Sequence, residues 1–213
     1  MRFVHENPVP LGLSRPKPPR GSQLVFTPLE VRRILRLVRD TDQLGFWVLA
    51  VFAGLRTEEI RRLQRFNHRW NLVRLRSAVI DLPHEIAKTY ARRVPILPVL
   101  RPWLEIVAAR RLPFFPPSHY VNCRRLRNRV LAPRTAAFDE KHRGDQSKIP
   151  PSRWAFNIAR RTYISYRLAS GDANYAELSH EVGNSEAMLR EYYVRHVTRE
   201  DAKIFFALTP DRI

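Results

Sequence analysis

The sequence predicts a mainly helical α+β domain that contains a small antiparallel β-sheet. Through most of the chain, apolar residues recur at the three- and four-residue spacing of amphipathic helices. Between residues 70 and 96 the pattern changes to short apolar runs, which are typical of strands separated by turns. With 213 residues, 44% of them hydrophobic, the chain is long enough to bury a sizeable core. We therefore expect a single domain over residues 25–213.

Residues 1–24 are expected to form a linker, because prolines at five positions prevent a regular helix. Arg15, Lys17 and Arg20 make the same segment basic. Such a segment could lie along a polyanion as an extended strap, or it could be the remaining connector of an upstream domain that has been lost.

The first three helices can be predicted from their ends. Residues 27–30, TPLE, combine a capping box with proline at the first helical position, so a helix should begin there and run to about residue 40. Residues 44–53 are apolar nearly all round, which predicts a buried central helix. Gly54 interrupts that helix, and Thr57 is expected to cap a short third one.

The sheet should follow these helices. Strands are expected near residues 72–75, 79–82 and 94–96, with turns at Pro83 and residues 88–92.

The rest of the chain is predicted to be helical, apart from a mobile polar loop at residues 132–153. The expected helices span residues 98–110, 122–131, 154–170, 173–182, 186–193 and 198–208.

The net charge of +18, from 38 basic and 20 acidic residues, is the strongest compositional signal of function. Such an excess favours binding to a polyanion, and nucleic acid is the usual one. A basic but solvated surface, or contact with anionic lipid, would give the same composition. Arginines at positions 124, 125, 127 and 129 lie in one predicted helix and could contact a phosphate backbone.

Cysteine content and hydropathy indicate a soluble, cytoplasmic protein. The single cysteine, Cys123, excludes an internal disulfide and suits a reducing compartment. We interpret Cys123 as a buried apolar residue rather than a nucleophile. The N-terminus lacks the apolar core of a secretory signal, and the longest apolar run, residues 46–55, is about half the length of a membrane span.

Three segments carry residues suited to phosphodiester chemistry. GLRTEEIRRL places Arg56 in a helical setting, and IAKTYARRVPI places Lys88 in a turn of the sheet. The segment 154–193 contains Arg160, a polar GNS turn, and two adjacent tyrosines that end at Tyr193.

Two arginines, a lysine and a tyrosine can cleave a phosphodiester without a metal ion. The transition state carries negative charge on two non-bridging oxygens, which suits the rigid fork of arginine. Each charge-assisted hydrogen bond in a dry site contributes about 1.5–3 kcal/mol. Close arginines favour the phenolate of tyrosine, whose reference pKa is about 10, and lysine can protonate the leaving 5′-oxygen. No cluster of His, Cys, Asp and Glu suggests a metal site, so we expect no cofactor.

These motifs, in this order, resemble those of the tyrosine recombinases, the phage-type integrases, over about residues 25 to 210. The resemblance implies double-stranded DNA as the partner, and strand cleavage and rejoining through a 3′-phosphotyrosine, as in site-specific recombination and DNA integration. The catalytic residues that it implies are Arg56, Lys88, Asn157, Arg160, Asn184 and Tyr193. The basic residues that we expect to bind DNA are Arg92, Arg93, Arg124, Arg125, Arg127 and Arg161.

The sequence departs from the family's pattern at two positions. Asn157 stands where the family usually has histidine, and Asn184 where it has histidine or tryptophan. Asparagine can donate a hydrogen bond but cannot carry a proton, and loss of a general base could cost about 10²–10⁴ in rate. His180 and His196 are candidates to replace it, although a solvated histidine is the simpler interpretation of each. A catalytically weakened DNA-binding remnant of an integrase is therefore the alternative function.

The nucleophile and the assembly each allow two possibilities. Adjacent residues on a helix point about 100° apart, so only one of Tyr192 and Tyr193 can face the arginines, and spacing favours Tyr193. The family's N-terminal core-binding domain is not expected in this sequence. The apolar segment 202–208 could dock on a second copy of the chain, as in the family, or pack on its own domain. A type IB topoisomerase and an RNA-binding protein have less support from the motifs.

Overall fold

The computed structural model of the chain describes residues 25–66, 68–126, 130, 157–192 and 197–213. The expected linker at residues 1–24 and the loop at residues 132–153 lie outside this part. Among the described residues, no helix is both long enough and apolar enough to cross a membrane.

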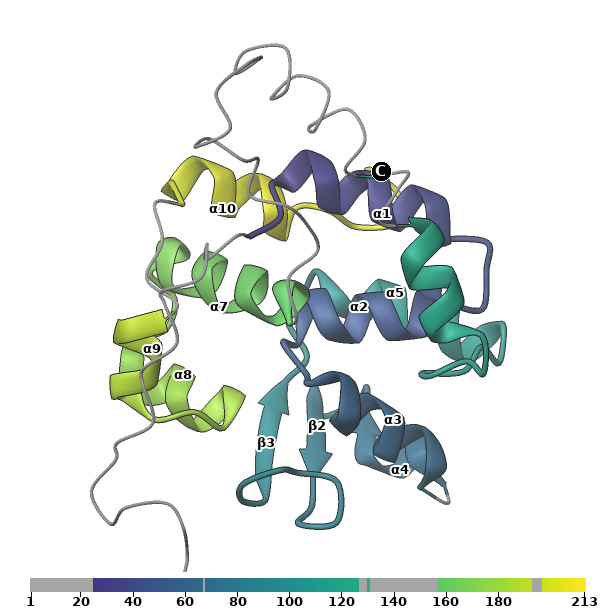
Figure 1. The fold of residues 1–213 in the computed structure, drawn as a ribbon, viewed down its shortest axis with the longest axis horizontal. Coiled ribbons are helices and arrows are strands. Elements are labelled where there is room, and N and C mark those ends of the chain that lie inside the picture. Colours follow the sequence, from purple (N-terminus) through teal and green to yellow (C-terminus); the bar gives the residue numbers. More distant parts are fainter. Residues whose placement is uncertain (1–24, 67, 127–129, 131–156, 193–196) are drawn as a thin grey trace, which may run out of the picture.

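The fold is a mainly helical α+β domain, as the sequence predicts (Figure 1). The first half contains α1 (Pro28–Val38), α2 (Leu44–Phe52), α3 (Thr57–Arg65), α4 (Arg69–Leu72) and α5 (Leu100–Ala109). The second half contains α7 (Ile158–Ser170), α8 (Tyr175–Val182), α9 (Glu186–Tyr192) and α10 (Arg199–Phe206).

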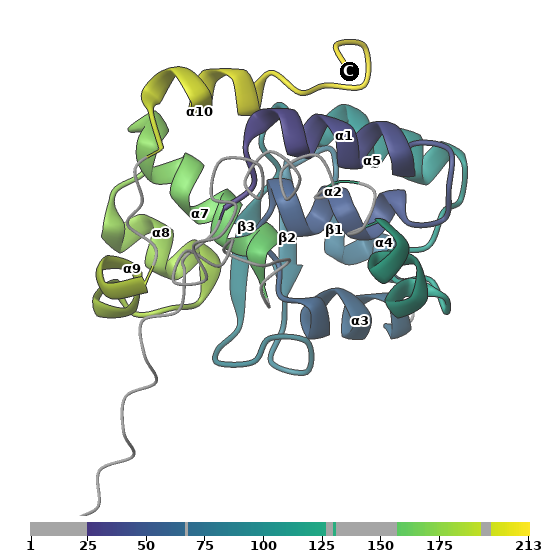
Figure 2. The same cartoon turned by 45° about the horizontal axis from the view of Figure 1, so that its top comes forward.

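The strands β1 (Val73–Arg74), β2 (Val79–Leu82) and β3 (Arg92–Pro95) form an antiparallel sheet in the order β1-β2-β3. The pairs Ile80↔Val94 and Leu82↔Arg92 fix the register of β2 against β3. The sheet lies between α3 and α4 on one side and α8 and α9 on the other (Figures 1 and 2). The change of hydrophobic period near residue 70 therefore predicted the sheet correctly.

The start of α1 confirms the capping box. The Thr27 backbone N–H donates to Glu30 Oε2 at 2.8 Å, and the Glu30 backbone N–H donates to Thr27 Oγ1 at 3.2 Å. These two bonds satisfy donors that have no partner inside the helix. The apolar stripe of α1 is buried at Val31, Ile34 and Leu35 and packs on α2.

All nine residues of α2 are buried, which confirms the central helix. It packs against α1, α5 and α7, so each of its sides meets another element. Trp47 and Phe52 are among the largest fully buried side chains of the core. Since α3 follows α2 directly, this buried helix fixes the position of Arg56 between them.

The cap of α3 differs from the prediction. Arg56, not Thr57, is the N-cap residue, and its extended backbone has φ −70° and ψ 147°. The Glu59 carboxylate accepts a hydrogen bond from the Arg56 backbone N–H at 2.9 Å and so caps the start of the helix. The basic helix also begins earlier than expected, since residues 119–126 are helical, and residues 127–129 and 131 lie outside the described chain.

The C-terminal segment packs on its own domain, one of the two arrangements that the sequence allows. Phe205 of α10 stacks on Tyr166 of α7 with 4.3 Å between ring centroids and 7° between planes. Trp103 Nε1 donates to the Leu208 carbonyl at 2.8 Å. Figure 1 shows α10 beside α1, above α7 and α2.

Candidate active site

The two predicted catalytic arginines meet at one amide oxygen. Arg56 lies at the N-terminus of α3, and Arg160 lies in the first turn of α7. Arg56 Nη2 donates to Asn184 Oδ1 at 2.7 Å, and Arg160 Nη2 donates to the same oxygen at 3.2 Å. The structure therefore brings together three residues that the sequence places far apart.

The contacts of Asn184 determine which way its amide points. A guanidinium has donors only, so the atom of Asn184 that faces both arginines is the oxygen. The Nδ2 amine must then point away from the two guanidinium groups. Asn184 can in this way hold both arginines and still present donor hydrogens to another acceptor.

The C-terminal end of α8 holds three guanidinium groups. The carbonyls of residues 181–183 accept, in that order, from Arg92 at 3.0 Å, from Arg160, and from Arg56 at 2.7 Å. The last carbonyls of a helix have no partner within it, and they form the negative end of its dipole. The end of α8 is therefore a natural place to gather cations.

Glu59 joins two of these arginines from the other side. Arg92 donates to both of its carboxylate oxygens at 2.9 and 2.8 Å, and Arg56 Nη1 donates to Oε1 at 2.9 Å. Burial would raise the pKa of Glu59, but the hydrogen bonds and charge of Arg92, with the Arg56 backbone N–H, outweigh it and lower the pKa to about 2. Glu59 is thus a buried anion that fixes the arginines, a role that the GLRTEEI motif did not reveal.

A second buried cluster joins α7 to α8. The Tyr163 hydroxyl donates to Glu181 Oε1, and Arg167 Nη2 donates to Glu181 Oε2 at 3.2 Å. Burial and the Glu181 charge raise the pKa of Tyr163 well above its ordinary value, so this tyrosine is a hydrogen-bond donor and not a nucleophile. These bonds fix α7 against α8, the two helices that contribute Arg160 and the carbonyls that accept from the arginines. No pattern in the sequence marks it, because these residues look like ordinary positions on two amphipathic helices.

Gly54 allows the close approach of α2 and α7. Its φ is +60°, and its carbonyl accepts from Arg160 Nη1 at 2.6 Å. A Cβ at this position would overlap the ring of Tyr163. Glycine is therefore required both for the backbone conformation and for the space beside the ring.

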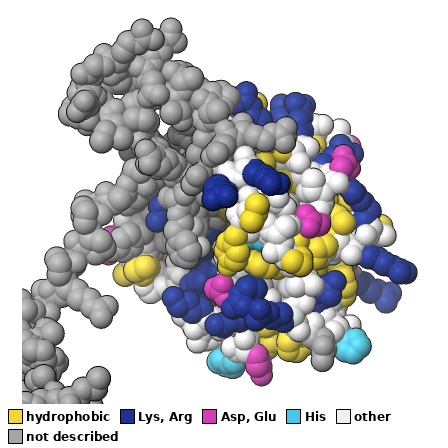
Figure 3. Space-filling view, turned by 45° about the vertical axis from the view of Figure 1, so that its right-hand side comes forward, with side chains coloured by type: hydrophobic (Ala, Val, Ile, Leu, Met, Phe, Trp, Pro, Cys, Tyr) yellow, Lys and Arg dark blue, Asp and Glu magenta, His cyan; other side chains and the backbone are white. Residues whose placement is uncertain are grey.

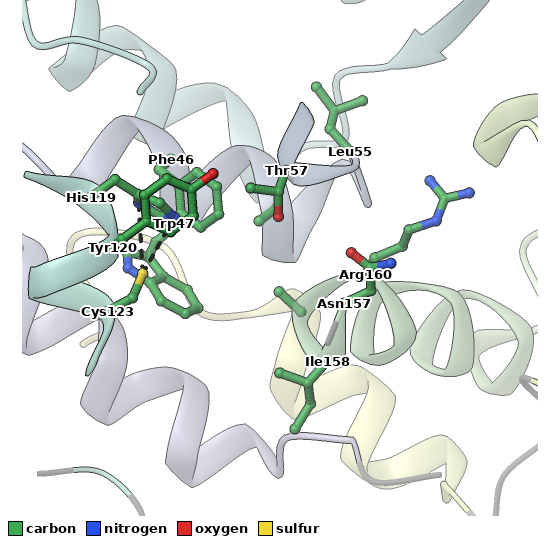
Figure 4. A pocket seen from close by; sticks show the side chains of 12 residues that line it. Phe46, Trp47, Leu55, Thr57, His119, Tyr120, Cys123, Asn157, Ile158 and Arg160 are labelled. Carbon is green, nitrogen blue, oxygen red and sulfur yellow. Dashed lines mark hydrogen bonds between the residues drawn. The ribbon is translucent and has the colours of Figure 1, made fainter. Parts of the chain in front are cut away.

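Asn157 and Arg160 also line a cavity of about 230 Å³ (Figure 4). Its opposite wall is largely aromatic, with Phe46 and Trp47, and the Arg160 side chain extends away from that wall. Asn157 itself has the left-handed backbone, with φ 62°, at the start of α7. The surface of the cavity is mostly apolar, and the Arg160 guanidinium points away from its aromatic wall, so the cavity is poorly suited to a phosphate.

The same cavity contains Cys123 and His119, whose sulfur and Nε2 are 3.4 Å apart. Burial raises the pKa of the Cys123 thiol to about 12 and lowers the pKa of His119 to about 4. Both shifts favour the neutral forms near pH 7, so the thiol is a poor nucleophile. Cys123 is only partly buried, which corrects the expectation of a fully buried residue.

The predicted DNA-binding residues have different surroundings. Arg92 requires a correction, because its side chain is 3% exposed and paired with Glu59, so it does not face a DNA backbone. Adjacent residues of a strand point to opposite faces, and Arg93 is accordingly exposed. Arg124 and Arg125 are exposed on the helical residues 119–126, and Arg161 is half-buried on α7.

Lys and Arg side chains outnumber Asp and Glu on the face shown in Figure 3. Arg62 and Arg65 of α3 are also exposed. A polyanion approaching this face would therefore meet more positive than negative groups.

The remaining predicted residues have the following places. Lys88 is exposed on the connection between β2 and β3, and His180 is exposed on α8. The helix that should carry the nucleophile, α9, ends at Tyr192. Tyr193, Arg127 and His196 lie outside the described residues.

Comparison with known proteins supports the fold. No family model matches the sequence, and no curated protein matches it by sequence. Among solved structures, the chain is similar to the crystal structure of XerA recombinase, with a TM-score of 0.50 and 17% identity. The similarity covers 94% of this chain and 68% of that chain. At this identity the comparison shows the fold, which resembles the catalytic domain of that tyrosine recombinase.

Proposed function

We propose that this chain cleaves and rejoins DNA strands through a 3′-phosphotyrosine at Tyr193, as a tyrosine-type site-specific recombinase does. The fold supports this function at a coarse level, since the structural neighbour is a recombinase. The observation that carries the proposal is the meeting of Arg56 and Arg160 at Asn184 Oδ1.

This arrangement suits a phosphate that is being attacked. The N-termini of α3 and α7 both supply their arginine to this place, and the positive ends of helix dipoles favour an anion. Two guanidinium groups that meet at one acceptor can each exchange a hydrogen bond to the protein for one to a non-bridging oxygen. Asn184 can add a donor from Nδ2, which gives the position a role even without the imidazole or indole that the family usually has there.

The proposed cleavage step uses residues from four segments. The Tyr193 oxygen forms a bond to phosphorus while the bond from phosphorus to the 5′-oxygen breaks. Lys88 gives a proton to the departing 5′-oxygen, and the phenol proton passes to solvent. The arginines stabilise the charge that develops on the non-bridging oxygens.

Trapping of a covalent adduct tests the proposal. The substrate is a library of DNA duplexes with random sequence on both sides of a nick, so that a short 5′-hydroxyl fragment diffuses away after cleavage and rejoining fails. We expect the wild-type chain to yield a protein–DNA adduct on a denaturing gel. Tyr193→Phe should abolish the adduct, whereas the matched control Tyr192→Phe should retain it.

Two results would count against this assignment. An adduct that persists in Tyr193→Phe would identify another nucleophile. Salt-sensitive DNA binding with no adduct in the wild-type chain would favour the alternative, a catalytically weakened DNA-binding remnant. That alternative draws on the asparagines at 157 and 184 and on the burial of Arg160, which is 2% exposed and donates to Gly54, Val182 and Asn184.

A further inference from the structure

Arg92 is a buried arginine that the phosphodiester chemistry does not use directly. It is the first residue of β3, and its side chain points inward between α3 and α8. All three of its guanidinium nitrogens donate: Nε to the Glu181 carbonyl at 3.0 Å, and Nη1 and Nη2 to the Glu59 carboxylate. One side chain therefore connects a strand to the start of one helix and to the end of another.

The connection that carries Lys88 reaches the same end of α8. The Tyr90 hydroxyl donates to the Ser179 carbonyl at 3.3 Å. A Cβ added to Gly183 would lie 3.2 Å from both Thr89 Oγ1 and Arg92 Cζ. Residues 89, 90 and 92 thus all pack against the last turn of α8, and the exposed Lys88 directly precedes them.

Arg92 and Arg56 share the two carboxylate oxygens of Glu59 as hydrogen-bond acceptors. Glu59 accepts from both nitrogens of the Arg92 fork and, with the same two oxygens, from the Arg56 side chain and backbone. With Arg92 in place, Arg56 uses Nη1 for Glu59 and Nη2 for Gly183 and Asn184. Without Arg92, both Glu59 oxygens would lose a hydrogen-bond donor, and the first residue of β3 would no longer be bonded to α8.

A buried ion pair is by itself weak support for stability, because apolar residues of similar volume can often replace it. The bidentate geometry does, however, fix orientation in a way that a single ammonium cannot. Here the fixed elements are the start of α3, the end of α8 and the strand that begins four residues after Lys88.

We propose that Arg92 is a positioning residue, which holds the Lys88 connection in place against α8 so that Lys88 can protonate the leaving 5′-oxygen. This inference rests on the proposed function where adduct formation is measured. Where the stability of the Lys88 connection is measured, it rests only on the contacts described above. Arg92 acts through Lys88 and touches neither DNA nor the reacting atoms.

The first test compares leaving groups. It uses Arg92→Lys, Arg92→Met and Lys88→Ala, with Arg74→Lys as the matched control, because Arg74 lies in the same sheet and pairs with Asp81 at the surface. Each protein is given a nicked duplex from the library above, with either oxygen or sulfur at the 5′-bridging position. A thiolate has a much lower proton affinity than an alkoxide and departs without a general acid.

We expect Arg92→Lys to slow adduct formation on the oxygen substrate by about 10²-fold, within the range of general-acid contributions. On the sulfur substrate, the rates of adduct formation of Arg92→Lys and Lys88→Ala should return to within about threefold of the wild-type rate. The reason is that cleavage of the P–S bond does not need a proton from Lys88. Arg74→Lys should match wild type on both. An Arg92→Lys protein that is equally slow on both substrates, or not slow at all, would overturn the proposal.

The second test needs no activity and so separates this inference from the proposed function. The amides of Ile86 and Ala87 donate to the Pro83 carbonyl at 3.0 and 2.9 Å within the connection. Hydrogen exchange of residues 83–91 should accelerate by about tenfold in Arg92→Lys and remain unchanged in Arg74→Lys. If Arg92→Met does not fold, Arg92→Lys decides alone, since it keeps the charge. Unchanged exchange in Arg92→Lys would overturn the inference even if wild type forms the adduct, and a missing wild-type adduct with accelerated exchange would count against the proposed function only.

Discussion

At the scale of single residues, the site depends on how a few polar atoms are shared. Asn184 Oδ1 serves two arginines, and Glu59 serves two arginines through both of its oxygens. Each acceptor is thus used more than once, so removing one partner affects several others. Double-mutant cycles on such a network would give coupling energies rather than independent contributions.

Glu59 gives a pH dependence whose sign can be worked out. Its pKa is near 4.5 in an unfolded chain and about 2 in the folded one, so the folded state favours the ionised form. The stabilisation is fully present above about pH 4.5 and is lost as the pH falls through about 2. The difference corresponds to roughly 3 kcal/mol.

We therefore expect Glu59→Gln to be less stable than wild type by about 3–5 kcal/mol at pH 7, because the buried Arg92 and the partly buried Arg56 lose their anion. The difference in free energy of unfolding between the two proteins should decrease as the pH falls from 5 to 2, because Glu59 of the wild type is protonated over this range. Urea denaturation of both proteins at a series of pH values measures the gap directly. A gap that stays constant over this range would contradict the assignment of Glu59 as the buried anion.

At the residue level, the sequence motifs selected Arg56, Arg160 and Asn184, and the structure places these three residues in contact. Their catalytic roles stay predictions, and the sequence did not show which side of a strand each arginine occupies. Arg92 and Arg93 looked alike in sequence, yet strand alternation buries the first and exposes the second. Composition could not supply the partner, Glu59, that decides this difference.

At the scale of elements, the boundaries that carry strong local signals were predicted well. The capping box at Thr27 marked the start of α1, and the apolar run of residues 44–53 marked α2. Gly183, at φ +65°, ends α8 and places its carbonyls where the arginines need them. The Tyr163–Glu181–Arg167 cluster was not predicted, since it arises only when α7 and α8 pack together.

A substitution at Gly54 tests whether the stability of the fold depends on the close approach of α2 and α7. Gly54→Ala should cost about 2–5 kcal/mol, because it adds left-handed strain of about 1–3 kcal/mol to an overlap with the buried Tyr163 ring. Gly171→Ala is the matched control, with φ +80° but only the end of the Arg199 side chain nearby. It should cost about 1 kcal/mol through backbone strain alone. Equal losses in chemical denaturation would show that the approach to Tyr163 does not matter.

At the scale of the whole molecule, the net charge of +18 favours a polyanion as partner, because the positive charges would otherwise repel one another. The proposal that this polyanion is DNA is tested by binding. The net charge could be calculated from the composition, whereas the arrangement of Arg56, Arg92 and Arg160 around the end of α8 could be seen only in the structure.

The salt dependence of DNA binding measures how many of these charges meet phosphates. If six to ten cations do so, affinity for a duplex should fall by about 10³–10⁵ between 50 and 200 mM salt. Replacing exposed Arg124 and Arg125 with Gln should reduce the slope of log affinity against log salt by about 2, because each phosphate contact contributes about 0.9.

The control replaces Arg101 and Arg110 with Gln. They are also partly exposed, at 50% and 39%, but they pair with Glu105 and Asp40 near α5. Both proteins lose the same formal charge, so a diffuse field would lower the two slopes equally. A lower slope confined to the Arg124 and Arg125 variant, measured by fluorescence anisotropy over a salt series, would identify the helix of residues 119–126 as a DNA contact. Equal slopes would instead attribute DNA binding to the overall charge and remove that helix from the interface.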